Sequence, residues 1–253
     1  MSTRLEVLLA PAEQTALTPE RLQGSVCVVF DILRATSVMI TALGHGAAGL
    51  VPVMEISEAV ELHRANPHYL LGGERQGFRI TAGQSGGVDF HFGNSPREYA
   101  SAHVLGKTII TTTTNGTRAL RSCSSAGQIL VGSFLNMKRL AEHLLEHPPA
   151  NLILICSGTE DEASYEDTLA AGALVHLLWS AYEQGHVADS AHIARDVYWA
   201  REHDLVSGMS HARNGRRLLG IPELREDVSY CLHWNTFPLL ARMDGDGVVR
   251  RFA

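Results

Sequence analysis

Polar residues that could do chemistry follow several apolar runs typical of buried β-strands. Four of these runs end directly in a loop that carries polar side chains and glycine. The carboxyl ends of parallel strands form the edge at which α/β sheets bind ligands, so we expect these loops to meet in one crevice. The polar residues in question are Asp31, Glu74, residues 112–115 and Ser157.

The segment TTTTNGT, residues 111–117, could be a hairpin turn or the rim of a site. Asn-Gly between two strands would indicate a hairpin. The continuation TRALRSCSSAG contains good helix formers and no alternation, so we predict strand, polar turn and helix instead. A helix N-terminus offers unpaired N–H groups and a positive dipole end, which favour a bound anion.

The combined residue types indicate a phosphorylated substrate handled with a metal ion. Hydroxyl groups, amide N–H groups and arginines suit an oxyanion, while carboxylates in the same crevice suit a divalent cation. Mg²⁺ prefers one or two carboxylates together with water and substrate oxygens. We therefore expect a small polyanionic substrate and Mg²⁺ at the strand ends.

Each of these residues also has a purely structural explanation. Asp31 can simply cap its loop, and Arg34 beside it can form a weak surface ion pair. Residues 94–96, Asn-Ser-Pro, form a competent helix start. The acidic residues 166–167 fall in the first turn of a predicted helix, where the dipole favours them whatever the function.

Motifs of several other chemistries are missing from the sequence. It has no GxxxxGK[ST] loop and no HExxH pair. Glu162 stands where a cysteinyl phosphatase loop on Cys156 would need an arginine. Leu33 stands where haloacid-dehalogenase phosphatases carry the second of two aspartates.

Composition narrows the class of protein. The 253 residues include 21 basic and 27 acidic side chains, so the net charge of −6 argues against nucleic-acid or anionic-membrane partners. No run approaches 18 apolar residues, and no signal peptide is recognised at the N-terminus. The four scattered cysteines indicate reduced thiols in a core. We expect a soluble, cytoplasmic protein.

Strand-like and helical runs alternate, which predicts a three-layer α/β/α fold with a mainly parallel or mixed sheet. We expect one domain over residues 1–253, with a helix-rich part from about residue 160. Predicted strands are 5–9, 26–30, 49–53, 69–73, 107–111, 128–132 and 151–156. Predicted helices are 36–45, 57–65, 96–103, 116–124, 136–146, 163–185 and a helical region over 189–219.

Two stretches about 80 residues apart share an order of elements, which predicts two related βαβα units. Ser57 and Asn136 are expected to cap the second helix of each unit, and Thr36 or Ser37 the first helix of the first unit. The apolar run 169–179 suits either the core or an interface in a homo-oligomer.

The sequence resembles the magnesium-dependent 2-phosphosulfolactate phosphatases. The matching motifs are DILRATSV (31–38), GGERQG (72–77), GNSPREY (93–99), TTTNGTRAL (112–120), GSFLN (132–136), EDTLAAG (166–172) and, more weakly, DVSYC (227–231). The resemblance implies a three-layer α/β fold and hydrolysis of 2-phospho-3-sulfolactate to 3-sulfolactate and phosphate, a step of coenzyme M biosynthesis. Related 2-phospho-carboxylates are alternative substrates.

Two positions depart from the family pattern. The segment GVDFHFGNSP either inserts two residues after Asp89 or replaces an acidic residue with His91, and Asn235 stands where an aspartate is common. A non-catalytic binder or sensor of sulfonated or phosphorylated acids is the rival function. Attack by water and by a nucleophilic Asp31 both remain open.

The hypothesis assigns a role to each motif residue. The metal ligands are Asp31, Glu74, Glu166 and Asp167. The catalytic residues are Asp31, Arg34, Glu74 and Asn115. The substrate-binding residues are Arg34, Thr36, Arg75, Asn94, Ser95, Thr113, Thr114, Asn115, Gly116 and Ser157.

Overall fold

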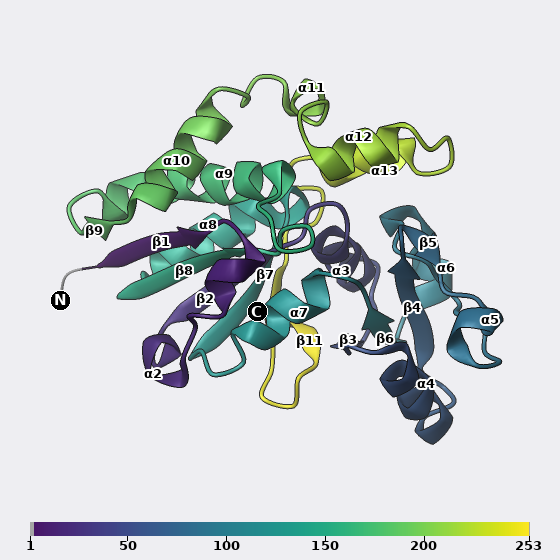
Figure 1. Ribbon diagram of the computed structural model, residues 1–253. Coiled ribbons are helices and arrows are strands. Elements are labelled where there is room, and N and C mark those ends of the chain that lie inside the picture. The colour runs from purple at the N-terminus through teal and green to yellow at the C-terminus, as the bar shows by residue number, and fades with distance from the viewer. Residues whose placement is uncertain (1–2, 253) are drawn as a thin grey trace.

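The computed structural model describes residues 3–252 and shows an eleven-stranded sheet with helices on both faces (Figure 1). The strands are β1 Arg4–Leu8, β2 Val26–Phe30, β3 Gly49–Pro52, β4 Leu70–Arg75, β5 Phe78–Arg79, β6 Thr108–Thr112, β7 Gln128–Gly132, β8 Asn151–Cys156, β9 His186–Val187, β10 Leu240–Met243 and β11 Val249–Phe252. The helices are α1 Pro11–Gln14, α2 Pro19–Leu22, α3 Ala35–Gly44, α4 Ile56–Ala65, α5 Ala82–Ser85, α6 Ser101–Val104, α7 Gly116–Ser122, α8 Met137–Glu146, α9 Tyr165–Tyr182, α10 Asp189–Trp199, α11 Leu205–Gly208, α12 Arg213–Leu219 and α13 Arg225–Cys231, with 3₁₀ turns η1 Pro96–Glu98 and η2 Phe134–Asn136.

All seven predicted strands are confirmed to within two residues at each end. Two predicted helices are interrupted. The expected helix 96–103 is split into η1 and α6, because Tyr99 between them is buried and its hydroxyl donates to Gly93 O at 2.8 Å. The region 189–219 contains three helices, and Asp204 restarts the second by accepting from the Ser207 N–H at 3.0 Å.

The predicted helix caps are largely wrong. Helix α3 begins at Ala35, so Thr36 and Ser37 lie inside it, and their hydroxyls bond to Asp31 O and Ile32 O at 3.0 and 2.9 Å. Helix α4 begins one residue before Ser57. Asn136 does precede α8 but makes no capping hydrogen bond, because its amide donates to two carbonyls of the chain interior.

The sheet is mixed because a C-terminal hairpin divides it. Strands β7, β2, β8, β1 and β9 are parallel in one half, and β3, β6 and β4 are parallel in the other. The β10–β11 hairpin lies between them and pairs antiparallel with both β7 and β3. The two halves therefore run in opposite directions.

The two predicted βαβα units are present as β2-α3-β3-α4 and β6-α7-β7-α8, with η2 before α8. They are interlocked in the sheet. Strand β2 pairs with β7, and β6 pairs with β3, so each unit sends its second strand into the half of the other. Neither unit can complete its strand pairing without the other.

Side chains of the central strands alternate between two buried layers, as the three-layer prediction requires. Val28 and Leu154 point to the layer that contains α8, α9 and α10, while Val29 and Ile155 point to the layer that contains α3 and α7. The apolar run of α9 is core, since Leu169, Ala170, Ala171, Ala173, Leu174, Val175 and Leu178 are all fully buried. None of the helices described in residues 3–252 combines the length and apolarity that crossing a membrane requires.

Helices α9 and α10 approach each other closely at Gly172, where an added Cβ would collide with the backbone carbonyl group of Ala194. Because backbone atoms cannot yield as a side chain does, Gly172→Ala should lower the free energy of unfolding by about 1–3 kcal/mol in spite of the better helix propensity of alanine. Thermal denaturation measures this. Gly83→Ala in α5, where only Thr81 Oγ1 lies near at 3.9 Å, is the matched control and should not destabilise the protein. Equal melting temperatures for both variants would contradict the close approach.

Candidate active site

Of the strand-end residues singled out in the sequence, Asp31, Glu74 and residues 113–115 line one cleft of about 200 Å³, whereas Thr112 and Ser157 do not. Because the two halves of the sheet run in opposite directions, a flat sheet would place the carboxyl ends of β2 and β6 on opposite edges. They meet because the twist between neighbouring strands accumulates across the intervening hairpin, so the edges turn toward each other. The expectation of one common edge was wrong, although the meeting of the loops is confirmed. The cleft is lined by Asp31, Leu33, Arg34, Glu74, Gln76, Gly77, Asn94, Thr113, Thr114, Asn115, Thr159, Glu160, Asn214, Arg217 and Leu218.

Asp31 ends β2 and is held rigidly by the start of α3. Its Oδ1 accepts from the Ala35 N–H at 3.1 Å, and its backbone N–H donates to Thr36 Oγ1 at 3.0 Å. Thr36 thus supports the Asp31 loop and does not line the cleft. Gly116, at the start of α7, lies against the carboxylate, where an added Cβ would be 2.6 Å from Asp31 Oδ2. This position accordingly needs glycine for close packing.

Asp167, in the first turn of α9, joins the loops after β2 and β8. Its Oδ1 accepts from the Ile32 N–H at 2.8 Å, and its Oδ2 accepts from Ser157 Oγ at 3.0 Å and the Gly158 N–H at 3.1 Å. Ser157 therefore does not line the cleft and instead holds the Asp167 carboxylate in position. Its neighbour Glu166 is also buried, and its Oε2 has no hydrogen-bond partner among the described residues.

The buried carboxyl groups raise one another's pKa. Burial, with the charge of Asp167, raises the pKa of Asp31 to about 7. Burial also raises the pKa of Glu166 and of Asp167 to about 7, with added repulsion from Asp31 and from Glu166 respectively. Ionisation of all three groups is therefore unfavourable below about pH 7 unless a positive charge compensates it.

The carboxylates at the cleft suit an ion such as Mg²⁺ better than a metal that takes all its ligands from the protein. Within residues 3–252, no group of three or more His, Cys, Asp or Glu side chains is arranged to hold a metal ion. Mg²⁺ does not need such a cage, because it keeps several waters and uses one or two carboxylates. The orphaned Glu166 Oε2 and the repulsion around Asp31 are the observations that favour a cation here.

Glu74 joins its own turn to the loop after β6. Its Oε2 accepts from the Gly77 N–H at 2.6 Å, and its Oε1 accepts from the N–H and the hydroxyl of Thr114 at 3.1 and 3.0 Å. The next residue, Arg75, is not placed at the cleft. Its guanidinium donates to Glu74 O, Met54 O and Thr112 Oγ1, on the other side of the strand.

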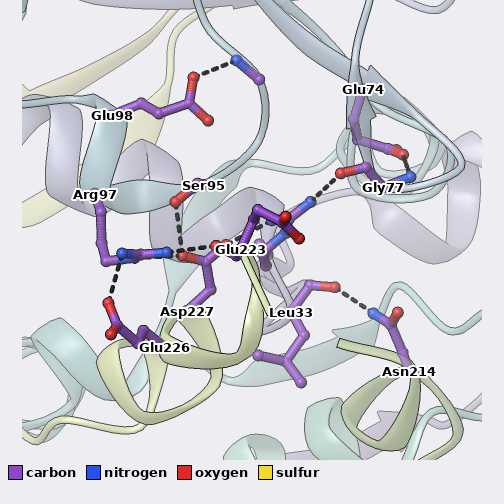
Figure 2. Close-up of polar contacts among 12 residues, drawn as sticks. Leu33, Glu74, Gly77, Ser95, Arg97, Glu98, Asn214, Glu223, Glu226 and Asp227 are labelled. Carbon is purple, nitrogen blue, oxygen red and sulfur yellow. Dashed lines mark hydrogen bonds and ion pairs between the residues drawn. The ribbon is translucent and has the colours of Figure 1, made fainter. Parts of the chain in front are cut away.

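Arg34 is buried, 3% exposed, and pairs with a residue that the sequence did not assign to the site. Its Nη1 donates to Asp227 Oδ2 at 2.6 Å, and its Nη2 donates to Gly77 O at 2.8 Å. Figure 2 shows Ser95 and Arg97 converging on the same Asp227, whose Oδ1 accepts from Ser95 Oγ at 2.6 Å and Arg97 Nε at 2.8 Å. Arg34 is therefore no surface partner of Asp31.

Asp227 was missed because its helix was only a weak motif match. The one available signal was its place as the first residue of DVSYC. Ser95 supports Asp227 and does not line the cleft, whereas its neighbour Asn94 does. Helix α13 thus fixes Arg34 from the opposite end of the chain.

Helix α12 covers the cleft from the C-terminal part of the chain, and sequence analysis also missed it. Asn214 donates to Leu33 O at 2.5 Å, as Figure 2 shows, and Arg217 donates to Gln76 O. Arg213 donates to Thr159 O at 2.8 Å. The helix therefore contacts the loops after β2, β4 and β8. No motif marked it, and the sequence predicted only a helical region over 189–219.

A sequence model of the family described as 2-phosphosulpholactate phosphatase matches residues 13–246. The chain belongs to this family. Relatives named probable 2-phosphosulfolactate phosphatase include one from Caldicellulosiruptor saccharolyticus, 36% identical over 85% of this chain and 88% of the relative. One from Symbiobacterium thermophilum is 36% identical over 87% and 92%, and one from Thermotoga maritima is 32% identical over 98% and 99%. The chain is thereby placed in an enzyme family of phosphatases.

The two positions that depart from the family pattern lie outside the cleft. His91 Nδ1 accepts from the Leu71 N–H at 3.0 Å, and burial lowers the pKa of its imidazole, which suits a neutral acceptor. Asp89 accepts from the Ala82 N–H at 2.7 Å. Asn235 Oδ1 accepts from the Lys138 N–H at 2.6 Å. All three side chains make local structural contacts.

The raised pKa values predict how stability of the metal-free protein depends on pH. Asp31, Glu166 and Asp167 hold protons up to about pH 7 when folded, but lose them near pH 4 when unfolded. The folded state binds more protons in that window, so the free energy of unfolding should fall as pH rises from about 4 to 7. Asp31→Asn should remove part of this fall in stability. The free energy of unfolding of the metal-free protein at pH 8 should therefore rise by on the order of 1–2 kcal/mol.

Urea denaturation at pH 5 and pH 8, with chelator present, measures the effect. Asp161→Asn is the matched control, because Asp161 is 76% exposed and pairs only with Arg118 at 3.5 Å. Its free energy of unfolding should follow that of the unaltered protein at both pH values. A destabilised Asp31→Asn variant at pH 8 would show that the carboxylates do not repel one another.

Proposed function

We propose that this protein is a Mg²⁺-dependent phosphatase that hydrolyses 2-phospho-3-sulfolactate, or a related 2-phospho-carboxylate, to 3-sulfolactate and phosphate. One observation carries the proposal. Asp31, Glu74 and residues 113–115 meet at one cleft with the buried Arg34. The buried carboxyl groups of Glu166 and Asp167 lie near that of Asp31. The names of the relatives supply the substrate.

Acidic and basic groups occupy different parts of the proposed site. Asp31 is the first metal ligand, with Glu74, Glu166 and Asp167 as further carboxylates that ligate or orient it. When bound, Mg²⁺ neutralises charge on phosphoryl oxygens and promotes formation of a nucleophile from water. Because the carboxylates repel one another when ionised, the cation is stabilised most strongly there.

The substrate's phosphate then lies between the carboxylates and Arg34. Arg34 is held at Nη1 and Nη2, so its orientation is fixed before substrate arrives and little entropy is lost on binding. Thr113, Thr114 and Asn115 line the cleft opposite; Thr114 donates to Glu74, whereas Thr113 and Asn115 can donate to phosphoryl oxygens. In this scheme water attacks phosphorus, the bond from phosphorus to the C2 oxygen breaks, and the alcohol leaves with a proton.

The proposal places the reaction in the cytoplasm, as a step of coenzyme M biosynthesis. All four cysteines are buried and form no disulfide, which supports a reducing compartment. The substrate's three anionic groups suit a cleft that gathers positive potential locally in a chain of net charge −6. Nucleic acid is not a partner in this scheme.

Phosphate release from a panel of 2-phosphorylated three-carbon acids tests the proposal directly. We expect Mg²⁺-dependent turnover of 2-phosphosulfolactate, loss of that turnover with excess chelator, and recovery when Mg²⁺ is restored. A flat response across the panel with Mg²⁺ present would refute the proposed function. Turnover that chelator leaves unchanged would refute the metal requirement alone.

Asp31→Asn separates a phosphatase from a binder of the same acids. The enzyme should lose turnover by at least about 10³-fold, because the substitution removes a ligand charge at the reacting phosphate. Binding of 3-sulfolactate, followed by calorimetry, should fall much less. Asp161→Asn is again the control and should keep full turnover. Binding of sulfolactate without turnover in the unaltered protein would favour the rival function, a sensor.

A further inference from the structure

The cleft contains one arginine whose charge no carboxylate balances. Arg34 and Arg217 are its two cationic lining residues, opposite the carboxylates of Asp31, Glu74 and Glu160. Arg34 forms a buried ion pair with Asp227 at 2.6 Å. Within residues 3–252, Arg217 has no acidic side chain within ion-pair distance of 4.0 Å. An uncompensated guanidinium beside an anion-binding cleft needs an anionic partner.

Two other arginines near the cleft, Arg97 and Arg213, are already paired with carboxylates. Arg97 forms ion pairs with Glu226 and Asp227, and Arg213 forms one with Glu162 at 3.0 Å. Arg217 instead donates a single hydrogen bond to Gln76 O and is exposed to solvent. Its charge is therefore available to a ligand without breaking an ion pair.

The two cleft arginines lie a short distance apart. Arg34 Nη2 donates to Gly77 O, and Arg217 Nη2 donates to the preceding carbonyl, Gln76 O. Consecutive residues of a chain are about 3.8 Å apart at their Cα atoms, so both guanidinium groups lie against one short turn. A small molecule with two anionic groups on neighbouring carbons can contact both.

The arginines are held differently, which suits different anions. Arg34 is buried, fixed by two acceptors and close to the Asp31 loop, so it suits the reacting phosphate. Arg217 extends from α12 at the mouth, where the far end of a bound acid would lie. A sulfonate offers three acceptor oxygens and a full negative charge, which a guanidinium binds well.

We propose that Arg217 is the residue that selects a substrate with a third anionic group, the sulfonate, in addition to the phosphate and the carboxylate. This inference rests on the proposed phosphatase function and names the discriminating contact. Helix α12 then serves as a specificity element, because it carries Arg217 across the cleft and is tied to the Asp31 loop by Asn214.

The test compares two substrates that differ only in this group, 2-phosphosulfolactate and 2-phospholactate. In Arg217→Gln, the ratio of kcat/KM for the sulfonated to the unsulfonated substrate should fall by about 10- to 100-fold, the size of a charge-assisted hydrogen bond. If Arg217 only stabilises the turn through Gln76 O, both substrates suffer equally. A ratio within about 2-fold of the unaltered protein would therefore overturn the proposal.

Arg216→Gln is the matched control on the same helix. Arg216 is exposed, donates to Ser210 O and His211 O, and does not line the cleft. The kcat/KM ratio should be unchanged in this variant. A fall as large as that of Arg217→Gln would show a general effect of charge on α12 and overturn the assignment.

Binding of 3-sulfolactate provides a measurement that does not depend on turnover. Calorimetry should show a dissociation constant at least about 10-fold higher in Arg217→Gln and unchanged in Arg216→Gln. If the protein turns over neither substrate but this difference is found, the phosphatase function fails and the role of Arg217 stands. Equal dissociation constants in all three proteins would overturn that role whatever the activity.

Discussion

Repulsion among buried carboxylates is the constraint on which the site depends. Asp31, Glu166 and Asp167 come from two segments far apart in sequence, and burial, with added repulsion from a neighbouring carboxyl group, raises the pKa of each to about 7. Hydrogen bonds satisfy Asp167, whereas Glu166 Oε2 has no partner among the described residues. Such an arrangement costs stability in the absence of a cation, which is typical of a site built for binding.

The twist of the mixed sheet brings the ends of β2 and β6 together at one cleft. The β10–β11 hairpin separates two parallel halves of opposite direction, and the interlocked βαβα units deliver β2 and β6 to different halves. Without twist, Asp31 and Glu74 would lie on opposite edges. Gly116, packed on Asp31, permits the close approach of α7.

The C-terminal helices supply one arginine of the cleft and fix the orientation of the other. Asp227 is fully buried and fixes Arg34, while Asn214 and Arg217 on α12 contact the loops that carry Asp31 and Glu74. Helices α12 and α13, which Figure 1 shows in yellow-green, pack against each other beside these loops. The loops that carry Asp31 and Glu74 and the helices that cover them are thus parts of one network, which holds Arg34 in a fixed orientation.

The sequence by itself determined the order of seven strands and of the longer helices, because apolar periodicity and turn residues are local properties, but it did not predict β5, β9 or the β10–β11 hairpin. It also predicted one crevice from Asp31, Glu74, residues 112–115 and Ser157, and of these Asp31, Glu74 and residues 113–115 line the cleft. Tertiary structure alone decided the direction of the two sheet halves, the turning away of Arg75 and the pairing of Arg34 with Asp227, 193 residues distant. Which distant groups face each other depends on strand pairing and packing, and no local pattern records that.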